Sequence, residues 1–181
     1  MAFDLRVLFA SDLEGGSTAS ADPVVNFAAI VEALDNENTL VLSSGDNWIP
    51  GPVYNAGAIR SSWRDSGALN DLYNTLYGVE TYDSLREVPG VIDQAFMNAI
   101  GFDASAIGNH EFDASPSAFA DLIERDQRTS NDDGSDDGPT GDRYEGLHFP
   151  YLSANLDFTG SDLESFVSPS IVINAGSNNP A

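Results

Sequence analysis

Short apolar runs and helically spaced apolar residues alternate along the first part of the chain. Residues 5–10 and 39–43 are apolar runs of strand length, and each is followed by polar residues and glycine. Between them, apolar residues recur three and four positions apart after an Asp-Pro pair at positions 22–23, which is a typical helix start. The pattern therefore predicts a strand, an amphipathic helix over about residues 23–35, and a second strand.

The second half of the chain continues this alternation of strand and helix patterns. We expect helices near residues 68–77, between residues 91 and 101, and from residue 116 onward, and strands at residues 104–107, 149–154 and 171–173. Strands that alternate with helices indicate βαβ units and a largely parallel sheet.

The charge of the chain narrows the choice of partners. The 181 residues include 29 acidic and 7 basic residues, all of the latter Arg, so the net charge is −22 at pH 7. Such a surface repels nucleic-acid backbones and anionic lipid heads, and we therefore expect neither partner. The acidity indicates either a solvated coat suited to a salty environment or, locally, a set of cation sites.

Cysteine usage and hydropathy exclude further classes of site and segment. The chain has no cysteine, which excludes disulfides, thiolate metal sites and cysteine nucleophiles within it. It contains no apolar run of the ~20 residues that a membrane span needs. Its first residues lack the basic region and apolar stretch of a signal peptide, so we predict neither a membrane span nor a signal peptide.

An acidic, glycine-containing stretch occupies residues 131–138, with the sequence Asn-Asp-Asp-Gly-Ser-Asp-Asp-Gly. The simplest interpretation is a flexible, solvated loop. The alternative is a Ca²⁺ site, because hard cations take several oxygen ligands and carboxylates are crowded here. The spacing does not fit an EF-hand loop.

Three predicted strands are followed by residues of the kinds that bind metals. Asp12 and Glu14 follow the first strand, Asp46 follows the second, and Asn109 and His110 follow the third. Ligands of parallel α/β sheets bind beyond the carboxyl ends of the strands, so these residues are expected at one edge. Each alone would more often be a cap or a turn residue, but the series favours a site for Mn²⁺, Mg²⁺, Fe or Zn²⁺.

Three motifs, in this order, carry a resemblance to a known family. They are Ser-Asp-Leu-Glu at residues 11–14, Ser-Gly-Asp-Asn at 44–47 and Gly-Asn-His-Glu-Phe-Asp at 108–113. Together they resemble the calcineurin-like metallophosphoesterases. The segments at 97–104 and 149–156 are similar to the 5′-nucleotidase-like branch of that superfamily.

The resemblance implies a fold, an activity and a location. The fold would be α/β, a metallophosphoesterase-type β-sandwich flanked by helices, whose amino-terminal half is built from βαβ units. Residues 1–181 would form the amino-terminal portion of the catalytic domain, with insertions at about 55–90 and 129–146. The activity would be hydrolysis of a small phosphate ester, such as a nucleotide, by a metal-activated water, and the location periplasmic or extracellular.

The resemblance also implies a role for individual residues. Asp46 would bridge two divalent ions, Asp12 would bind the first of them, and Asn109 would bind the second. His110 would face the phosphoryl group rather than a metal, and Asp113 would hold its imidazole in orientation.

The chain departs from the family pattern at two points. Glu14 stands where the family usually has a histidine, although a carboxylate could still reach the first metal and would favour harder ions. The family's later histidine ligands, including a Gly-His-x-His stretch, are absent, so we expect the carboxyl-terminal half of the domain to be missing. The alternative function is therefore a non-catalytic, acidic cation-binding or interaction module, an inactive fragment.

Several residues near these motifs fit a structural role better than a chemical one. We expect Glu111 to shape its motif rather than to bind a metal, and His148 to be an ordinary loop residue. Trp48 could stack on a base, but packing is the preferred interpretation.

Overall fold

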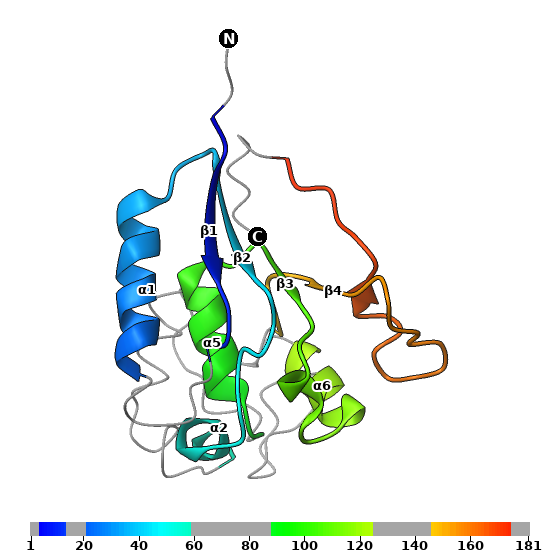
Figure 1. Ribbon diagram of the computed structural model, residues 1–181. Helices are drawn as coiled ribbons and strands as arrows, with labels where there is room; N and C mark the ends of the chain where they lie inside the picture. Colours follow the sequence, from blue (N-terminus) through cyan, green and yellow to red (C-terminus); the bar gives the residue numbers. More distant parts are fainter. Residues whose placement is uncertain (1–3, 14–20, 59–87, 125–145, 175–181) are drawn as a thin grey trace, which may run out of the picture.

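The computed structural model describes residues 4–13, 21–58, 88–124 and 146–174 (Figure 1). These residues form a five-stranded sheet in which the strands follow their order in the sequence and all neighbours are parallel. The strands are β1 (Arg6–Ala10), β2 (Thr39–Ser43), β3 (Ala104–Ala106), β4 (Tyr151–Leu152) and β5 (Val167–Ser168). The expected α/β fold with a parallel sheet is confirmed, and the second layer of the expected sandwich is not among the described elements.

The helices begin and end where local sequence signals place them. They are α1 (Ala21–Leu34), α2 (Pro52–Ala56), α5 (Val91–Ile100) and α6 (Pro116–Ile123), together with the 3₁₀ turn η2 (His110–Phe112). Gly101 ends α5 in the left-handed conformation with φ of 83°, which favours glycine. The side chain of Ser115 caps α6 by accepting a hydrogen bond from the Ala118 N–H at 3.0 Å.

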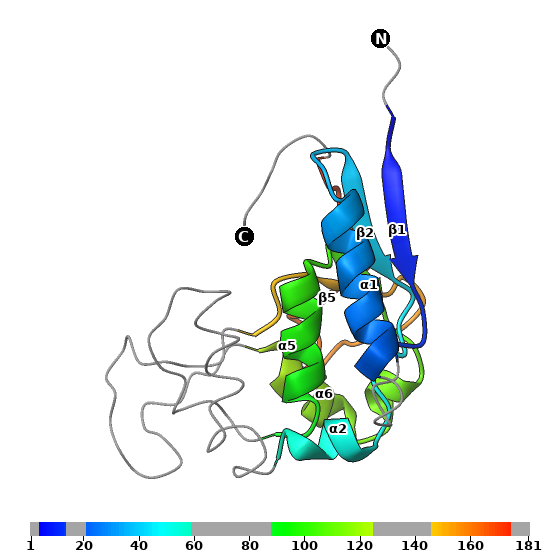
Figure 2. The same cartoon turned by 90° about the vertical axis from the view of Figure 1, so that its left-hand side faces the viewer.

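Helices α1 and α5 lie side by side against one face of the sheet (Figures 1 and 2). Val31 of α1, Val41 of β2 and Ala95 of α5 are buried in the same core cluster. The opposite face of β1 is open, and Phe9 there is 60% exposed. The helices therefore cover one side of the sheet and leave its carboxyl-terminal edge for the loops.

An aromatic cluster fills the core between α6 and the carboxyl end of the sheet. The rings of Phe119 and Tyr151 pack edge to face with centroids 4.8 Å apart, and Trp48 lies 5.6 Å from Phe119. Trp48 is only 2% exposed, so the prediction that it packs rather than stacks on a base is confirmed.

One predicted strand is wrong. Residues 171–173 are not a strand, and the fifth strand forms at Val167–Ser168 instead. The buried side chain of Leu163 anchors this segment, and the Val167 N–H donates to the Leu163 carbonyl at 3.1 Å. Val172 is 88% exposed, so its apolar character is not used in the sheet.

Several expectations fall outside the described ranges. The predicted helix near residues 68–77, the calcium alternative at 131–138 and Glu14 lie there, as do most of the two insertions. Within the described ranges, no helix is both long and apolar enough to span a bilayer.

Candidate functional site

The loops after β1 and β2 are joined by backbone hydrogen bonds. Ala10 is the register partner of Ser43, so the two strands end at the same level. The Ser44 N–H donates to the Ala10 carbonyl at 3.2 Å, and the Asp12 N–H donates to the Gly45 carbonyl at 3.4 Å. The backbone of Asp12 is thereby held beside the loop that carries Asp46.

The loops after β2 and β3 touch because two glycines face each other. A Cβ on Gly45 would lie 2.3 Å from the Gly108 nitrogen, and one on Gly108 would lie 2.2 Å from Oδ1 of Asp46. Gly45 also has a φ of +96°, where a side chain is strained. The glycines of the Ser-Gly-Asp and Gly-Asn-His motifs thus allow the Asp46 carboxylate to pack directly against the Gly108 backbone.

Both predicted aspartate ligands have an unusual backbone conformation. Asp12 and Asp46 each have a φ of 52°, in the left-handed region that aspartate tolerates better than most residues. Oδ1 of Asp46 accepts a hydrogen bond from the His110 N–H at 2.8 Å. Such conformations cluster at functional sites, and here both fall on carboxylates at the same edge of the sheet.

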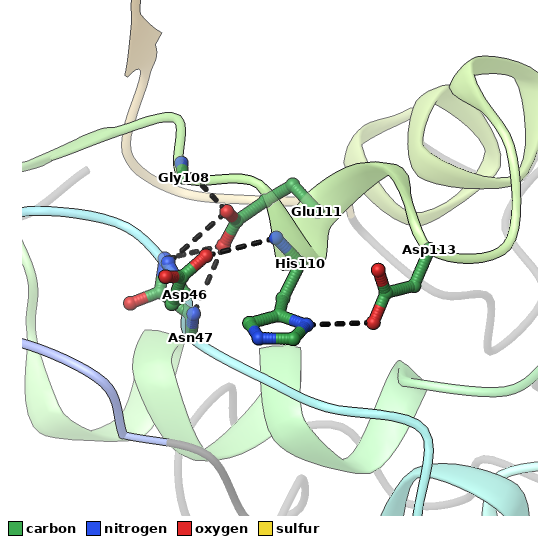
Figure 3. A network of polar contacts seen from close by, with 6 residues as sticks. All are labelled: Asp46, Asn47, Gly108, His110, Glu111 and Asp113. Atoms are coloured by element: carbon green, nitrogen blue, oxygen red, sulfur yellow. Dashed lines mark hydrogen bonds and ion pairs between the residues drawn. The ribbon is translucent and has the colours of Figure 1, made fainter.

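His110 and Asp113 form a pair at the start of the segment that follows β3. Nδ1 of His110 lies 2.7 Å from Oδ2 of Asp113, and the side chains are 27% and 33% exposed. Figure 3 shows the imidazole beside the Asp46 loop with Asp113 on its far side. Asp113 thereby fixes the ring through Nδ1.

Glu111 joins the two motif loops through its carboxylate. Its carboxylate accepts hydrogen bonds from the N–H groups of Asp46 (3.1 Å), Asn47 (2.9 Å) and Gly108 (2.7 Å) (Figure 3). Burial raises the pKa of Glu111, and the backbone donors oppose this increase. The structure thus gives Glu111 the motif-shaping role that the sequence predicts.

The structure places some predicted site residues close together and leaves others unplaced. It links Asp46 to His110 and His110 to Asp113, and it brings the loop of Asp12 against that of Asp46. Asn109 is exposed and precedes η2 in the third loop. Among the described residues, no three or more His, Asp or Glu side chains form a group that could hold a metal ion. The assignment of metal ligands therefore stays a prediction.

Sequence analysis missed two buried polar residues near this site. Asn47 is 2% exposed and Asp93, in the first turn of α5, is 7% exposed. Both border a cavity of about 20 Å³, which is large enough for one water molecule. The available signals were the position of Asn47 directly after Asp46 and the occurrence of Asp93 between the apolar residues Val91 and Met97 of α5.

Two proteins similar to this chain in sequence are named as a nucleotide phosphoesterase and a 5′-nucleotidase. The trifunctional nucleotide phosphoesterase YfkN of Bacillus subtilis is 33% identical over 93 residues, which are 51% of this chain and 6% of that protein. A snake venom 5′-nucleotidase of Gloydius brevicauda is 34% identical over 85 residues, 45% of this chain and 11% of that protein. No protein-family model matches the chain.

A solved structure supports the same fold. The 5′-nucleotidase precursor of Thermus thermophilus matches 95% of this chain and 26% of its own with a TM-score of 0.50 and 20% identity. The chain thus spans only a small part of each of these proteins. Sequence over about half of the chain and fold over nearly all of it confirm the resemblance to the amino-terminal part of the 5′-nucleotidase-like metallophosphoesterases.

Proposed function

We propose that this chain carries the amino-terminal part of the active site of a metal-dependent phosphoric ester hydrolase that acts on nucleotides. The observation that carries the proposal is the contact among the loops after β1, β2 and β3, which hold Asp12, Asp46 and the His110–Asp113 pair. The names of the relatives support a nucleotide as substrate, and the venom relative supports an extracellular or periplasmic location.

The oxygen donors of the three loops fit two hard divalent cations such as Mn²⁺ or Mg²⁺, and Zn²⁺ or Fe remain alternatives. Asp46 would be shared, because a carboxylate has about four lone-pair positions and the His110 N–H occupies one. Asp12 and Glu14 would serve the first ion, and the amide oxygen of Asn109 the second. When bound, the ions would place positive charge at the phosphoryl oxygens and lower the pKa of the attacking water.

His110 would supply the proton chemistry. With Nδ1 held 2.7 Å from Asp113, Nε2 would be the ring nitrogen that acts on the substrate. The Asp113 carboxylate stabilises the charged imidazolium, so His110 could protonate the leaving oxygen or balance charge in the transition state. Asp113 would act by fixing the orientation of the ring.

The net charge makes phosphate binding depend on the cations. A chain of net charge −22 repels a phosphate ester at long range, although salt screens this beyond ~10 Å at 0.1 M. Divalent ions are the largest local charges in such a site and reverse its sign. Substrate binding should therefore require the metal.

The count of ligands supports a second candidate, a non-catalytic cation-binding module. Asp12, Glu14, Asp46 and Asn109, with Asp46 shared, give each ion two or three protein ligands and no imidazole. Catalytic Zn²⁺ sites typically have three protein ligands. We therefore expect these 181 residues alone to bind metal weakly and to hydrolyse phosphate esters slowly or not at all.

Calorimetric titration with Mn²⁺ tests the metal assignment. Asp46→Asn should weaken binding about tenfold or more, which corresponds to ~1.4 kcal/mol. Glu32→Gln removes an exposed carboxylate of α1 and is the charge-matched control, with unchanged affinity expected. Equal affinity of Asp46→Asn and the unaltered chain would contradict the assignment.

Hydrolysis separates the two candidate functions. A nucleoside monophosphate and an aryl phosphate should be turned over with millimolar Mn²⁺ by a longer chain that includes the following residues of the protein. Turnover by the longer chain that Asp46→Asn abolishes supports the hydrolase. Metal binding without turnover in the longer chain supports the non-catalytic module.

A further inference from the structure

A buried polar cluster lies beneath the three loops. Its members come from β2, the loop after β2, β3, η2 and β4, and each is 5% exposed or less: Ser43, Asn47, Ser105, Glu111 and Tyr151. Polar groups at this depth are costly unless their hydrogen bonds are satisfied. The arrangement of these bonds shows what the cluster holds in place.

The side-chain amide of Asn47 is the centre of the cluster. Nδ2 donates to the hydroxyl oxygens of Ser105 and Tyr151 at 2.9 Å each and to Oε1 of Glu111 at 3.2 Å. Oδ1 accepts a hydrogen bond from the Ser43 hydroxyl at 2.5 Å. Because two N–H groups serve three acceptors, one of them is shared. A single amide thus ties together β2, β3 and β4 at the level where Ser43, Ser105 and Tyr151 are register partners.

Glu111 connects the buried cluster to the loops that carry Asp46 and His110. Oε1 accepts from the backbone and side chain of Asn47, whereas Oε2 accepts from the N–H groups of Asp46 and Gly108. One carboxylate therefore spans the loop after β2 and the loop after β3. The contact between Oδ1 of Asp46 and the His110 N–H lies beside this bridge (Figure 3).

We propose that Asn47 is a positioning residue: its buried amide fixes the Glu111 carboxylate, and the Asn47–Glu111 pair sets the placement of Asp46 relative to His110. The inference rests on the proposed function, because this placement matters for chemistry only if Asp46 and His110 serve phosphoester hydrolysis. A fully satisfied polar network specifies one arrangement of the elements it joins. Here it joins three neighbouring strands to the loop that carries Asp46 and to Glu111.

Amide hydrogen exchange of the metal-free chain tests the positioning directly. The readout is the exchange rate of the His110 amide relative to that of the Val41 amide, which donates to Oδ2 of Asp103 at 2.7 Å in the neighbouring part of the sheet. Global destabilisation accelerates both amides, whereas loss of positioning accelerates His110 alone. Neither amide is bonded to Asn47, so the ratio reports on placement rather than on a deleted contact.

The variants act on both ends of the pair. Asn47→Ala removes the side-chain amide at the centre of the cluster. Glu111→Gln keeps the shape of the Glu111 side chain but turns an N–H₂ group toward backbone donors. In each, the exchange ratio should rise about tenfold, as expected for the loss of a buried hydrogen-bond partner. Ser115→Ala, which only uncaps α6, should leave the ratio unchanged. If Asn47→Ala fails to fold, Glu111→Gln carries the test.

Mn²⁺ affinity, measured by calorimetry on the same proteins, separates this inference from the proposed function. Asn47→Ala and Glu111→Gln should weaken Mn²⁺ binding about tenfold, and Ser115→Ala should not. An unchanged exchange ratio in the folded variants would overturn the positioning role. A raised ratio in a chain that binds no Mn²⁺ would support the placement by Asn47 and overturn the metal-dependent function.

Discussion

Asp93 should make the stability of this protein fall as the pH rises toward neutrality. Its side chain is 7% exposed, and its Oδ2 has no hydrogen-bond partner among the described residues. Burial raises the pKa of Asp93 from 3.8 to about 7, against the opposing effect of a hydrogen bond from its own backbone N–H. The pKa of Tyr54 in α2 is also raised, chiefly by burial and then by the charge of Asp93.

The direction of this pH dependence follows from whether the folded or the unfolded state binds the Asp93 proton more tightly. Because the pKa of Asp93 is higher in the folded state, the folded protein keeps the proton between pH 3.8 and about 7 while the unfolded chain loses it. The stability contribution is therefore complete below pH 3.8 and is lost as the pH rises through about 7. At 1.36 kcal/mol per pKa unit, the loss amounts to about 4 kcal/mol, a large part of a typical total of ~5–15 kcal/mol.

The perturbation is Asp93→Asn, which keeps the shape and removes the titration. Urea unfolding followed by circular dichroism from about pH 4 to about pH 8 gives the free energy of unfolding of both proteins. Subtracting the free energy of unfolding of the unaltered chain from that of the variant cancels the contributions of the other carboxylates. As the pH rises, this difference should grow in favour of the variant by about 4 kcal/mol. Glu32→Gln, at an exposed position, should show no such growth. Parallel stability curves for Asp93→Asn and the unaltered chain would refute the reasoning.

Three further predictions concern the loops and the chemistry. Gly108→Ala places a Cβ 2.2 Å from Asp46 Oδ1 and should lower the free energy of unfolding by about 1–3 kcal/mol and weaken Mn²⁺ binding. At the control position Gly160, φ is +75° and no described residue other than the chain neighbours has an atom within 4 Å of an added Cβ, so Gly160→Ala should affect stability only. His110→Ala in an active, longer chain should lower kcat by ~10²–10⁴ with unchanged metal content by elemental analysis, and parallel loss of metal would instead make His110 a ligand. Glu14→Ala should weaken Mn²⁺ affinity in calorimetry, and unchanged affinity would leave Glu14 as a loop residue.

Signals that act over a few residues were readable from the sequence. Ser115 and Pro116 mark the start of α6, and Gly101 marks the end of α5, because caps depend on neighbours along the chain. The order of strands and helices also predicted that the loops carrying Asp46 and His110 would share one edge. That prediction held because parallel strands must all end on the same side.

Only the tertiary structure decided which apolar run became the fifth strand and which polar side chains became buried. Residues 171–173 have strand character, but the anchor at Leu163 pairs Val167 with β4 instead. Asn47 and Glu111 are 64 positions apart, and Asp93 has a raised pKa only because α5 carries it into the core. Burial, hydrogen bonding and charge depend on which elements pack around a side chain, and this packing is set by contacts across the whole fold rather than by neighbours along the chain.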